Sequence, residues 1–188
     1  MYYSNKMPFG KKGDFVTSPD ISQIFGEIIG IWILDIWIKL NKPKMALNFA
    51  QKAINLGIAD KYTFYEQALV LYKIGYPEEA IFSLKKILEV DNKDSEAFNL
   101  IGKCLIKLKM FDEAVDSFCD AIYFKSDIQE YYTNLGLSLS ELGRFNDAQE
   151  CLTKAISLSE DSSTANYLLG KIYSKSGNAK AALEQYTI

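Results

Sequence analysis

Residues 95–128 read SEAFNLIGKCLIKLKMFDEAVDSFCDAIYFKSDI, and residues 129–162 repeat the same pattern of apolar and small residues thirty-four positions later. The same period is marked along the chain by one column of alanines: Ala46, Ala80, Ala114, Ala148 and Ala182. Thirty-four residues is the length of one helix–turn–helix unit in a common class of repeat proteins. The sequence therefore predicts an all-α array in which each unit packs against the next.

Within residues 95–128, two apolar stripes at helical spacing predict two helices joined by a turn. The stripes are Phe98, Ile101, Gly102 and Leu105 in the first helix, and Ala114, Phe118 and Ala121 in the second. We expect the second helix to pass closely at Gly102, where a side chain would hold the two backbones apart. The turn falls at 109–111, and Gly143 and Gly177 stand there in later units, as suits a helix end with positive φ.

This pattern resembles the tetratricopeptide repeat family, although the family's opening Trp is Phe or Tyr here. The best match is formed by Tyr132, Leu135, Gly136, Leu139, Ala148, Leu152 and Ala155. Where the family usually has proline near the end of a unit, this chain has Asn92, Ser126 and Glu160. The resemblance implies a helix–turn–helix solenoid over residues 27–188, following a non-repeat N-terminal segment. The expected units are 27–60 (a hybrid unit), 61–94, 95–128, 129–162 and a truncated 163–188.

The N-terminal segment has a different character. Ser18, Pro19 and Asp20 form a helix start, with serine as the N-cap and proline at the first helical position, and predict a helix from Pro19 to about Leu40. The run KKGDFVTSPDISQIFGE at 11–27 resembles the entry segment of the MidA-like, S-adenosylmethionine-dependent methyltransferases that act on a respiratory complex I subunit.

The methyltransferase chemistry is not expected here, because the glycine-rich loop that holds the cofactor in that family is missing. Residues 45–50 open the second helix of a repeat at the place where the first strand should start. We therefore expect residues 1–26 to be a methyltransferase-like remnant fused to a repeat array, with no catalytic residue, cofactor or metal. Two alternatives stay open: a remnant or subunit of an active methyltransferase, or a segment that serves only as the first helix of the unit 27–60, with Trp37 in a large apolar slot.

Composition narrows the function classes. The chain has 188 residues, a net charge of -3, 48% hydrophobic residues and no histidine, so nucleic-acid binding and histidine-based catalysis are not expected. Cys104, Cys119 and Cys151 lack CxxC spacing, and we expect buried, reduced thiols in a cytoplasmic protein, with a secreted effector as the alternative. The scarcity of arginine indicates an AT-rich bacterial source. The apolar run 28–40 is too short to span a membrane.

A partner protein, as a peptide or a helix, is the expected ligand. In the family, exposed positions of the first helices line a concave groove, and tyrosines there give a large contact area with little loss of entropy. The groove residues that we expect are Tyr62, Tyr65, Tyr72, Asn99, Lys103, Lys107, Asn134, Tyr167 and Lys171. Some family members clamp a terminal carboxylate there, but Thr164 and Leu168 stand where that clamp needs cations, so chaperone-tail recognition is not expected. A solvated face without a dedicated ligand is the alternative.

The last unit contains only residues 163–188, eight fewer than a full unit. Its second helix, expected from about Ala179, would leave Leu183 and Tyr186 partly exposed. An end unit that lacks a polar cap exposes the face meant for a neighbour. We therefore expect either fraying after about Ala182 or self-association through this end.

Overall fold

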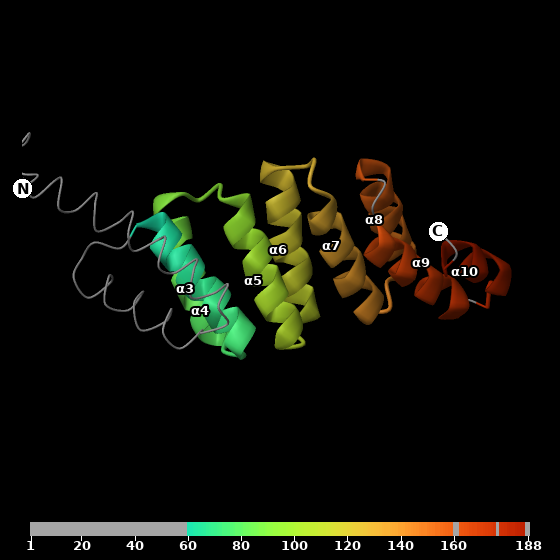
Figure 1. The fold of residues 1–188 in the computed structure, drawn as a ribbon, viewed down its shortest axis with the longest axis horizontal. Coiled ribbons are helices and arrows are strands. Elements are labelled where there is room, and N and C mark those ends of the chain that lie inside the picture. Colours follow the sequence, from blue (N-terminus) through green and yellow to red (C-terminus); the bar gives the residue numbers. More distant parts are fainter. Residues whose placement is uncertain (1–59, 160–161, 176, 187–188) are drawn as a thin grey trace, which may run out of the picture. The chain divides into compact units, whose positions relative to one another are not determined.

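The computed structural model describes residues 60–159, 162–175 and 177–186, and these form helices and connecting turns without a β-strand (Figure 1). The all-α prediction is confirmed. The N-terminal segment 1–26, the helix expected from Pro19 and the hybrid unit 27–60, apart from Asp60, lie outside the described residues. The helices are α3 (Lys61–Ile74), α4 (Pro77–Val90), α5 (Ser95–Lys107), α6 (Phe111–Phe124), α7 (Gln129–Glu141), α8 (Phe145–Leu158), α9 (Ser163–Lys175) and α10 (Ala179–Tyr186).

The first helix of each described unit begins where the sequence predicts, at Lys61, Ser95, Gln129 and Ser163. At α5 the cause is local: the Asp94 side chain accepts a hydrogen bond from the Ala97 amide at 2.8 Å, which satisfies one free N–H of the helix start. The second helix α4 begins with Pro77, whose missing N–H costs nothing at that position.

The first helices end in a shared turn geometry. In the turn after α7, Gly143 has a φ of 79°, and the Arg144 amide donates to the Leu139 carbonyl at 2.9 Å. This hydrogen bond joins two residues that are five positions apart, and it closes the helix end as in a Schellman motif. Lys109 takes the same place after α5 with a φ of 61°, a conformation that a side chain disfavours. The expected positive φ of Gly143 and Gly177 is confirmed.

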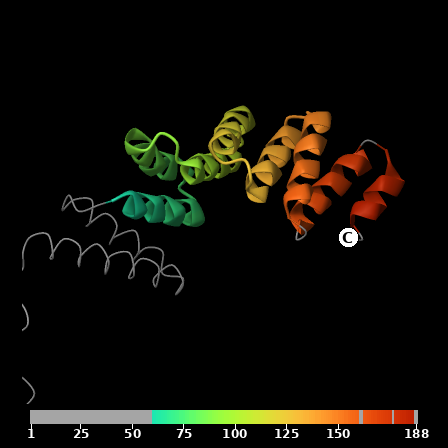
Figure 2. The same cartoon turned by 90° about the horizontal axis from the view of Figure 1, so that it is seen from above.

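The chain divides into two compact units, residues 1–66 and 67–188. In the second unit, α5 packs on α6, α7 on α8 and α9 on α10, and each hairpin also contacts the next. Figure 2 shows these hairpins from above, in chain order from green to red. The first helices α5, α7 and α9 contact one another in sequence, so their exposed residues share one side of neighbouring hairpins.

The core of each hairpin is made by the predicted stripe of the second helix. In α6, Ala114, Phe118 and Ala121 are fully buried, and in α8 Ala148, Leu152 and Ala155 are buried to the same degree. Small residues at both ends of the stripe let the helices approach, while the large residue in the middle fills the space between them.

Candidate functional site

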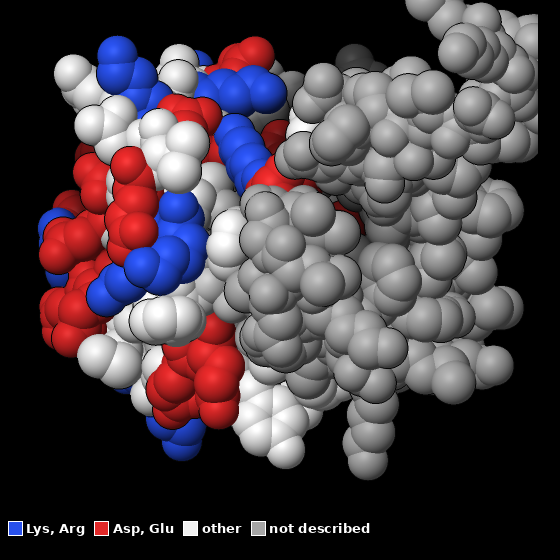
Figure 3. Space-filling model, turned by 90° about the vertical axis from the view of Figure 1, so that its left-hand side faces the viewer, with Lys and Arg blue, Asp and Glu red and all other residues white. Residues whose placement is uncertain are grey.

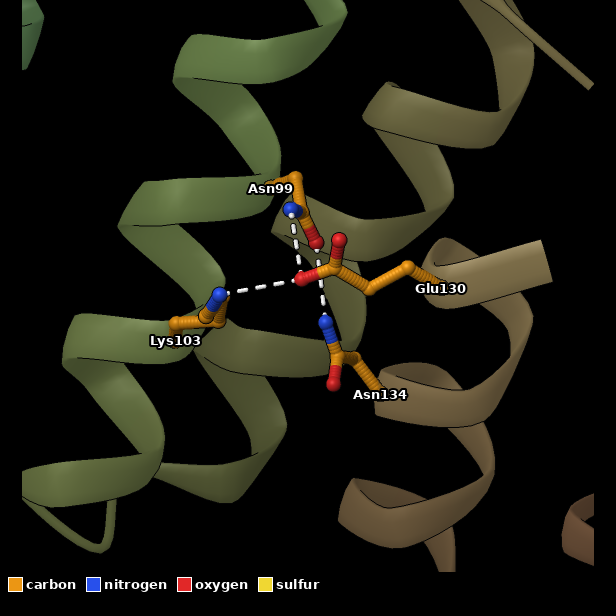
Figure 4. Close-up of polar contacts among 4 residues, drawn as sticks. All are labelled: Asn99, Lys103, Glu130 and Asn134. Carbon is orange, nitrogen blue, oxygen red and sulfur yellow. Dashed lines mark hydrogen bonds and ion pairs between the residues drawn. The ribbon is translucent and has the colours of Figure 1, made fainter. Parts of the chain in front are cut away.

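Four polar side chains meet between α5 and α7 (Figure 4). Lys103 Nζ lies 2.9 Å from Glu130 Oε1, and Asn99 Nδ2 donates to the same oxygen at 3.5 Å. Asn134 Nδ2 donates to Asn99 Oδ1 at 3.0 Å. We call Asn99, Lys103, Glu130 and Asn134 the α5–α7 polar cluster. The structure thus brings together three residues predicted for the groove and adds a carboxylate.

The electrostatics of the cluster favour an ionised Glu130. Partial burial opposes ionisation, but the hydrogen bond and charge of Lys103 and the amides of Asn99 and Asn134 outweigh it. The pKa of Glu130 therefore lies below its ordinary value. Lys103 is thereby paired with a permanent negative charge at neutral pH.

A second contact group joins α3 to α5. Lys107 Nζ donates to the Tyr72 carbonyl at 2.6 Å and lies 3.9 Å from the centroid of the Tyr72 ring, while Lys103 Nζ lies 5.8 Å from the same centroid. The ring face attracts both cations. Three predicted residues thus meet here, and the Lys107 ammonium is engaged within the chain.

Between α7 and α9, Lys171 Nζ lies 3.7 Å from Glu141 Oε1. The Tyr167 side chain, one helical turn earlier on α9, is 59% exposed. Both predicted residues therefore lie on the side shared by the first helices, one ion-paired and the other presenting a large aromatic surface.

We define the first-helix face as the side of the second unit that carries these contacts. It consists of Tyr72, Lys103, Lys107, Glu130, Asn134, Glu141, Tyr167 and Lys171. Its three lysines all have partners within the chain: Glu130 for Lys103, Glu141 for Lys171 and the Tyr72 carbonyl for Lys107.

The structure corrects part of the predicted site. Asn99 is buried rather than exposed, and its amide is hydrogen-bonded to Glu130 and Asn134. Thr133, which stands at the same repeat position as Asn99 in the next unit, is buried as well. Tyr62 is exposed and Tyr65 half-buried, but both belong to the unit 1–66 and lie outside the first-helix face defined here.

Glu130 and Glu141, the two acids that pair with lysines of this face, were not among the predicted site residues. The repeat register does contain a signal for these two ion pairs, since each acid stands at a position that faces a lysine of a neighbouring first helix. The spacing from Lys103 to Glu130 is twenty-seven residues, and from Glu141 to Lys171 it is thirty. Reading positions across units, instead of within each unit, would have found both pairs.

The cysteines also differ from expectation. Cys104 is buried, Cys151 is partly buried and Cys119 is exposed, so the prediction of three buried thiols is wrong for Cys119. Cys119 follows the buried Phe118 on α6 and turns out of the packing stripe. Burial raises the pKa of Cys104 to about 12 and that of Cys151 to about 11.

Charges on the described part of the surface are mixed in sign. Figure 3 shows Lys and Arg side chains beside Asp and Glu, without a wide area of positive charge alone on that face. Among the described residues, no helix is long and apolar enough to cross a membrane, and no group of three or more acidic or cysteine side chains could hold a metal ion. An open hollow on α8 is lined by Gln149, Glu150, Thr153, Lys154 and Ser157.

The chain belongs to the tetratricopeptide repeat family, whose model matches most of its length. The matched segments are residues 62–94, 95–128, 129–162 and 163–187.

The N-terminal stretch is similar to a different class of protein. It is 57% identical over 42 residues to the Drosophila melanogaster protein arginine methyltransferase NDUFAF7 homolog, mitochondrial. These 42 residues make up 22% of this chain and 10% of that protein. The Homo sapiens protein arginine methyltransferase NDUFAF7, mitochondrial, is 54% identical over 41 residues, or 22% of this chain and 9% of that protein. The chain thus spans about a tenth of the length of these relatives.

Solved structures with the same fold share little sequence with this chain. A crystal structure of MamA is 24% identical with a TM-score of 0.75 and covers 82% of this chain and 91% of its own. YrrB, described as a TPR protein with an unusual peptide-binding site, is 22% identical with a TM-score of 0.67 and covers 83% of this chain and 80% of its own. At these identities the likeness establishes the fold alone.

Proposed function

We propose that this protein is a non-catalytic interaction scaffold whose first-helix face binds a peptide or helix of a partner protein. The observation that carries the proposal is the pairing of all three lysines of that face with groups of the chain itself, beside the exposed aromatic surface of Tyr167. Tetratricopeptide repeat proteins bind protein or peptide partners, and YrrB is one with a peptide-binding site.

The paired lysines also define the kind of partner. Since a charged group of a partner would have to displace the present partner of one of these lysines before it could bind, apolar and hydrogen-bond contacts are the more favourable means of binding. Tyr72 and Tyr167 supply large, stiff contact surfaces at small entropic cost. We expect a partner segment of low net charge, bound with weak dependence on salt.

Capture of partners from a lysate with the immobilised chain tests the proposal. Wild type is compared with Tyr72→Ala/Tyr167→Ala, which removes the aromatic surface of the first-helix face, and with Tyr123→Ala. Tyr123 is the matched control, because it is 82% exposed but lies on the second helix α6. A partner lost only with the first pair of substitutions, and bound alike at low and high salt, supports the proposal. A partner lost with Tyr123→Ala, or with neither variant, contradicts it.

A methyltransferase-related role is the second candidate, because about 40 residues match arginine methyltransferase relatives at about 50% identity. The missing glycine-rich loop argues against binding of S-adenosylmethionine, and we propose that the chain does not bind it. Calorimetric titration with S-adenosylmethionine tests this proposal. Binding at micromolar affinity would contradict it and would support a methyltransferase function.

Self-association through α10 is a separate proposal, supported by the 65% exposure of Leu183 on that helix. A leucine side chain exposed on a helix offers apolar surface that a second copy of the chain can cover. Light scattering of wild type and Leu183→Ser tests it: a dimer that disappears in the variant supports the proposal, and a monomer in both contradicts it.

A further inference from the structure

The α5–α7 polar cluster has the make-up of a carboxylate-binding site that is already filled. An ammonium, Lys103 Nζ, and an amide nitrogen, Asn99 Nδ2, both reach one oxygen of Glu130, at 2.9 and 3.5 Å (Figure 4). Asn134 holds Asn99 in the required orientation by donating to its Oδ1 at 3.0 Å. Charge-assisted hydrogen bonds of this kind are among the strongest that a carboxylate can form.

The repeat fold itself does not require this set. At the next junction, between α7 and α9, the positions equivalent to Asn99, Lys103 and Glu130 are Thr133, Leu137 and Thr164. Those helices pack without the cluster. The four polar residues are therefore a local feature of one junction and not a part of the packing pattern.

We propose that Glu130 is a specificity-determining residue of the first-helix face, an internal carboxylate that occupies this site and so excludes the carboxylates of a partner. The inference rests on the proposed function of that face. Glu130 is tethered beside its donors, so it acts at an effective concentration of about millimolar order or higher, and a free carboxylate must compete against it.

Two further properties support Glu130 in this role. Its pKa is held below the ordinary value, so the occupying group is ionised at neutral pH and does not leave by protonation. The Glu130 side chain is 51% exposed, so the site that it fills is open to solvent. Removing this side chain would leave Lys103 and Asn99 facing that opening.

Sodium acetate is the probe, with sodium chloride at equal ionic strength as the reference, and the side-chain amide signals of Asn99 and Asn134 are followed by NMR. In wild type we expect no saturable shift. In Glu130→Ala we expect a saturable shift, because the internal competitor is gone. Glu130→Thr should behave in the same way, and it is tolerated by the fold because Thr164 stands at that position in the next unit.

Two controls make the result specific. Glu96→Ala removes an acid at the same repeat position of the preceding unit and should leave the wild-type response unchanged. Lys103→Ala combined with Glu130→Ala should abolish the acetate response. Equal responses in wild type and both Glu130 variants, or no response in any of them, would overturn the inference. Because acetate replaces the partner, either result is independent of whether the first-helix face binds a peptide.

Discussion

Gly102 on α5 and the ring of Phe118 on α6 lie so close that no side chain fits between them. A Cβ atom built on Gly102 would lie 2.6 Å from both Cε1 and Cζ of Phe118. The equivalent pair in the next unit is the same: a Cβ on Gly136 would lie 2.7 Å from Leu152 Cγ. The close passage expected at Gly102 is therefore confirmed, and the glycine column marks contact between helices rather than a special backbone conformation.

Gly102→Ala should destabilise the protein despite the better helix propensity of alanine. The propensity gain is about 1 kcal/mol, whereas overpacking a buried site costs about 1–3 kcal/mol. Phe118 is fully buried and cannot swing away cheaply. We expect a net loss of about 1 kcal/mol in the free energy of unfolding, measured by urea denaturation.

A double-mutant cycle separates the two contributions. In a Phe118→Ala background the clash is absent, so Gly102→Ala should become neutral or stabilising there. If the substitution costs the same in both backgrounds, contact with the Phe118 ring is not the cause.

Lys109→Gly should stabilise the turn after α5. Lys109 has a φ of 61°, whereas Gly75, Gly143 and Gly177 fill the same place in the other three units. The left-handed conformation costs a side chain about 1–2 kcal/mol, part of which is offset by the greater freedom of glycine in the unfolded chain. We expect a gain of about 0.5–1 kcal/mol by thermal or urea unfolding. Lys125→Gly, at the extended C-cap of α6, is the control and should not stabilise.

Much of the fold could be predicted from the sequence, because a repeat imposes the same packing on every unit. The period set the starts of the first helices, and the small–large–small stripe of α6 predicted the buried Ala114, Phe118 and Ala121. These features depend on contacts that recur every thirty-four residues, so each unit supports the interpretation of the others.

The candidate site was less predictable, because it depends on contacts that occur once. The groove positions taken from the family pattern included Asn99, but they did not show that its side chain would be buried. Pairing of Lys103 with Glu130 depends on side chains from two units, and a pattern read within one unit does not contain it. The same limit applies to Cys119, whose exposure depends on its orientation on α6.

Asn166→Leu should stabilise the last hairpin. Asn166 stands in the column of Phe64, Phe98 and Tyr132, it is buried, and its Oδ1 has no hydrogen-bond partner in the described part of the chain. An unsatisfied buried polar group costs about 1–3 kcal/mol. We expect a rise in Tm of a few degrees, roughly 2–4 °C for each kcal/mol regained. A fall in Tm would show that the amide has a stabilising partner or that leucine does not fit.

The three thiols should react with a thiol reagent in the order of their exposure. Cys119 should be modified first, Cys151 more slowly, and Cys104 only after unfolding. Burial raises the pKa of all three thiols, most strongly that of Cys104, so the thiolate that reacts is scarce at neutral pH. Mass spectrometry after timed labelling gives the order. Modification of Cys104 before Cys151 in the native protein would contradict the packing of α5.

Glu130 should make the stability of the protein depend on acid pH. Its folded-state pKa is lowered, so the folded protein binds the proton less readily than the unfolded chain, whose glutamate titrates near about 4.3. The stabilisation is therefore fully present above that value and is lost as pH falls through the folded-state pKa. Because the side chain is 51% exposed, solvent screening limits the effect to less than about 1 kcal/mol. Wild type should exceed Glu130→Gln in urea stability at neutral pH, and the difference should shrink as pH falls through the folded-state pKa of Glu130. A gap between wild type and Glu130→Gln that persists at low pH would contradict the assigned ion pair.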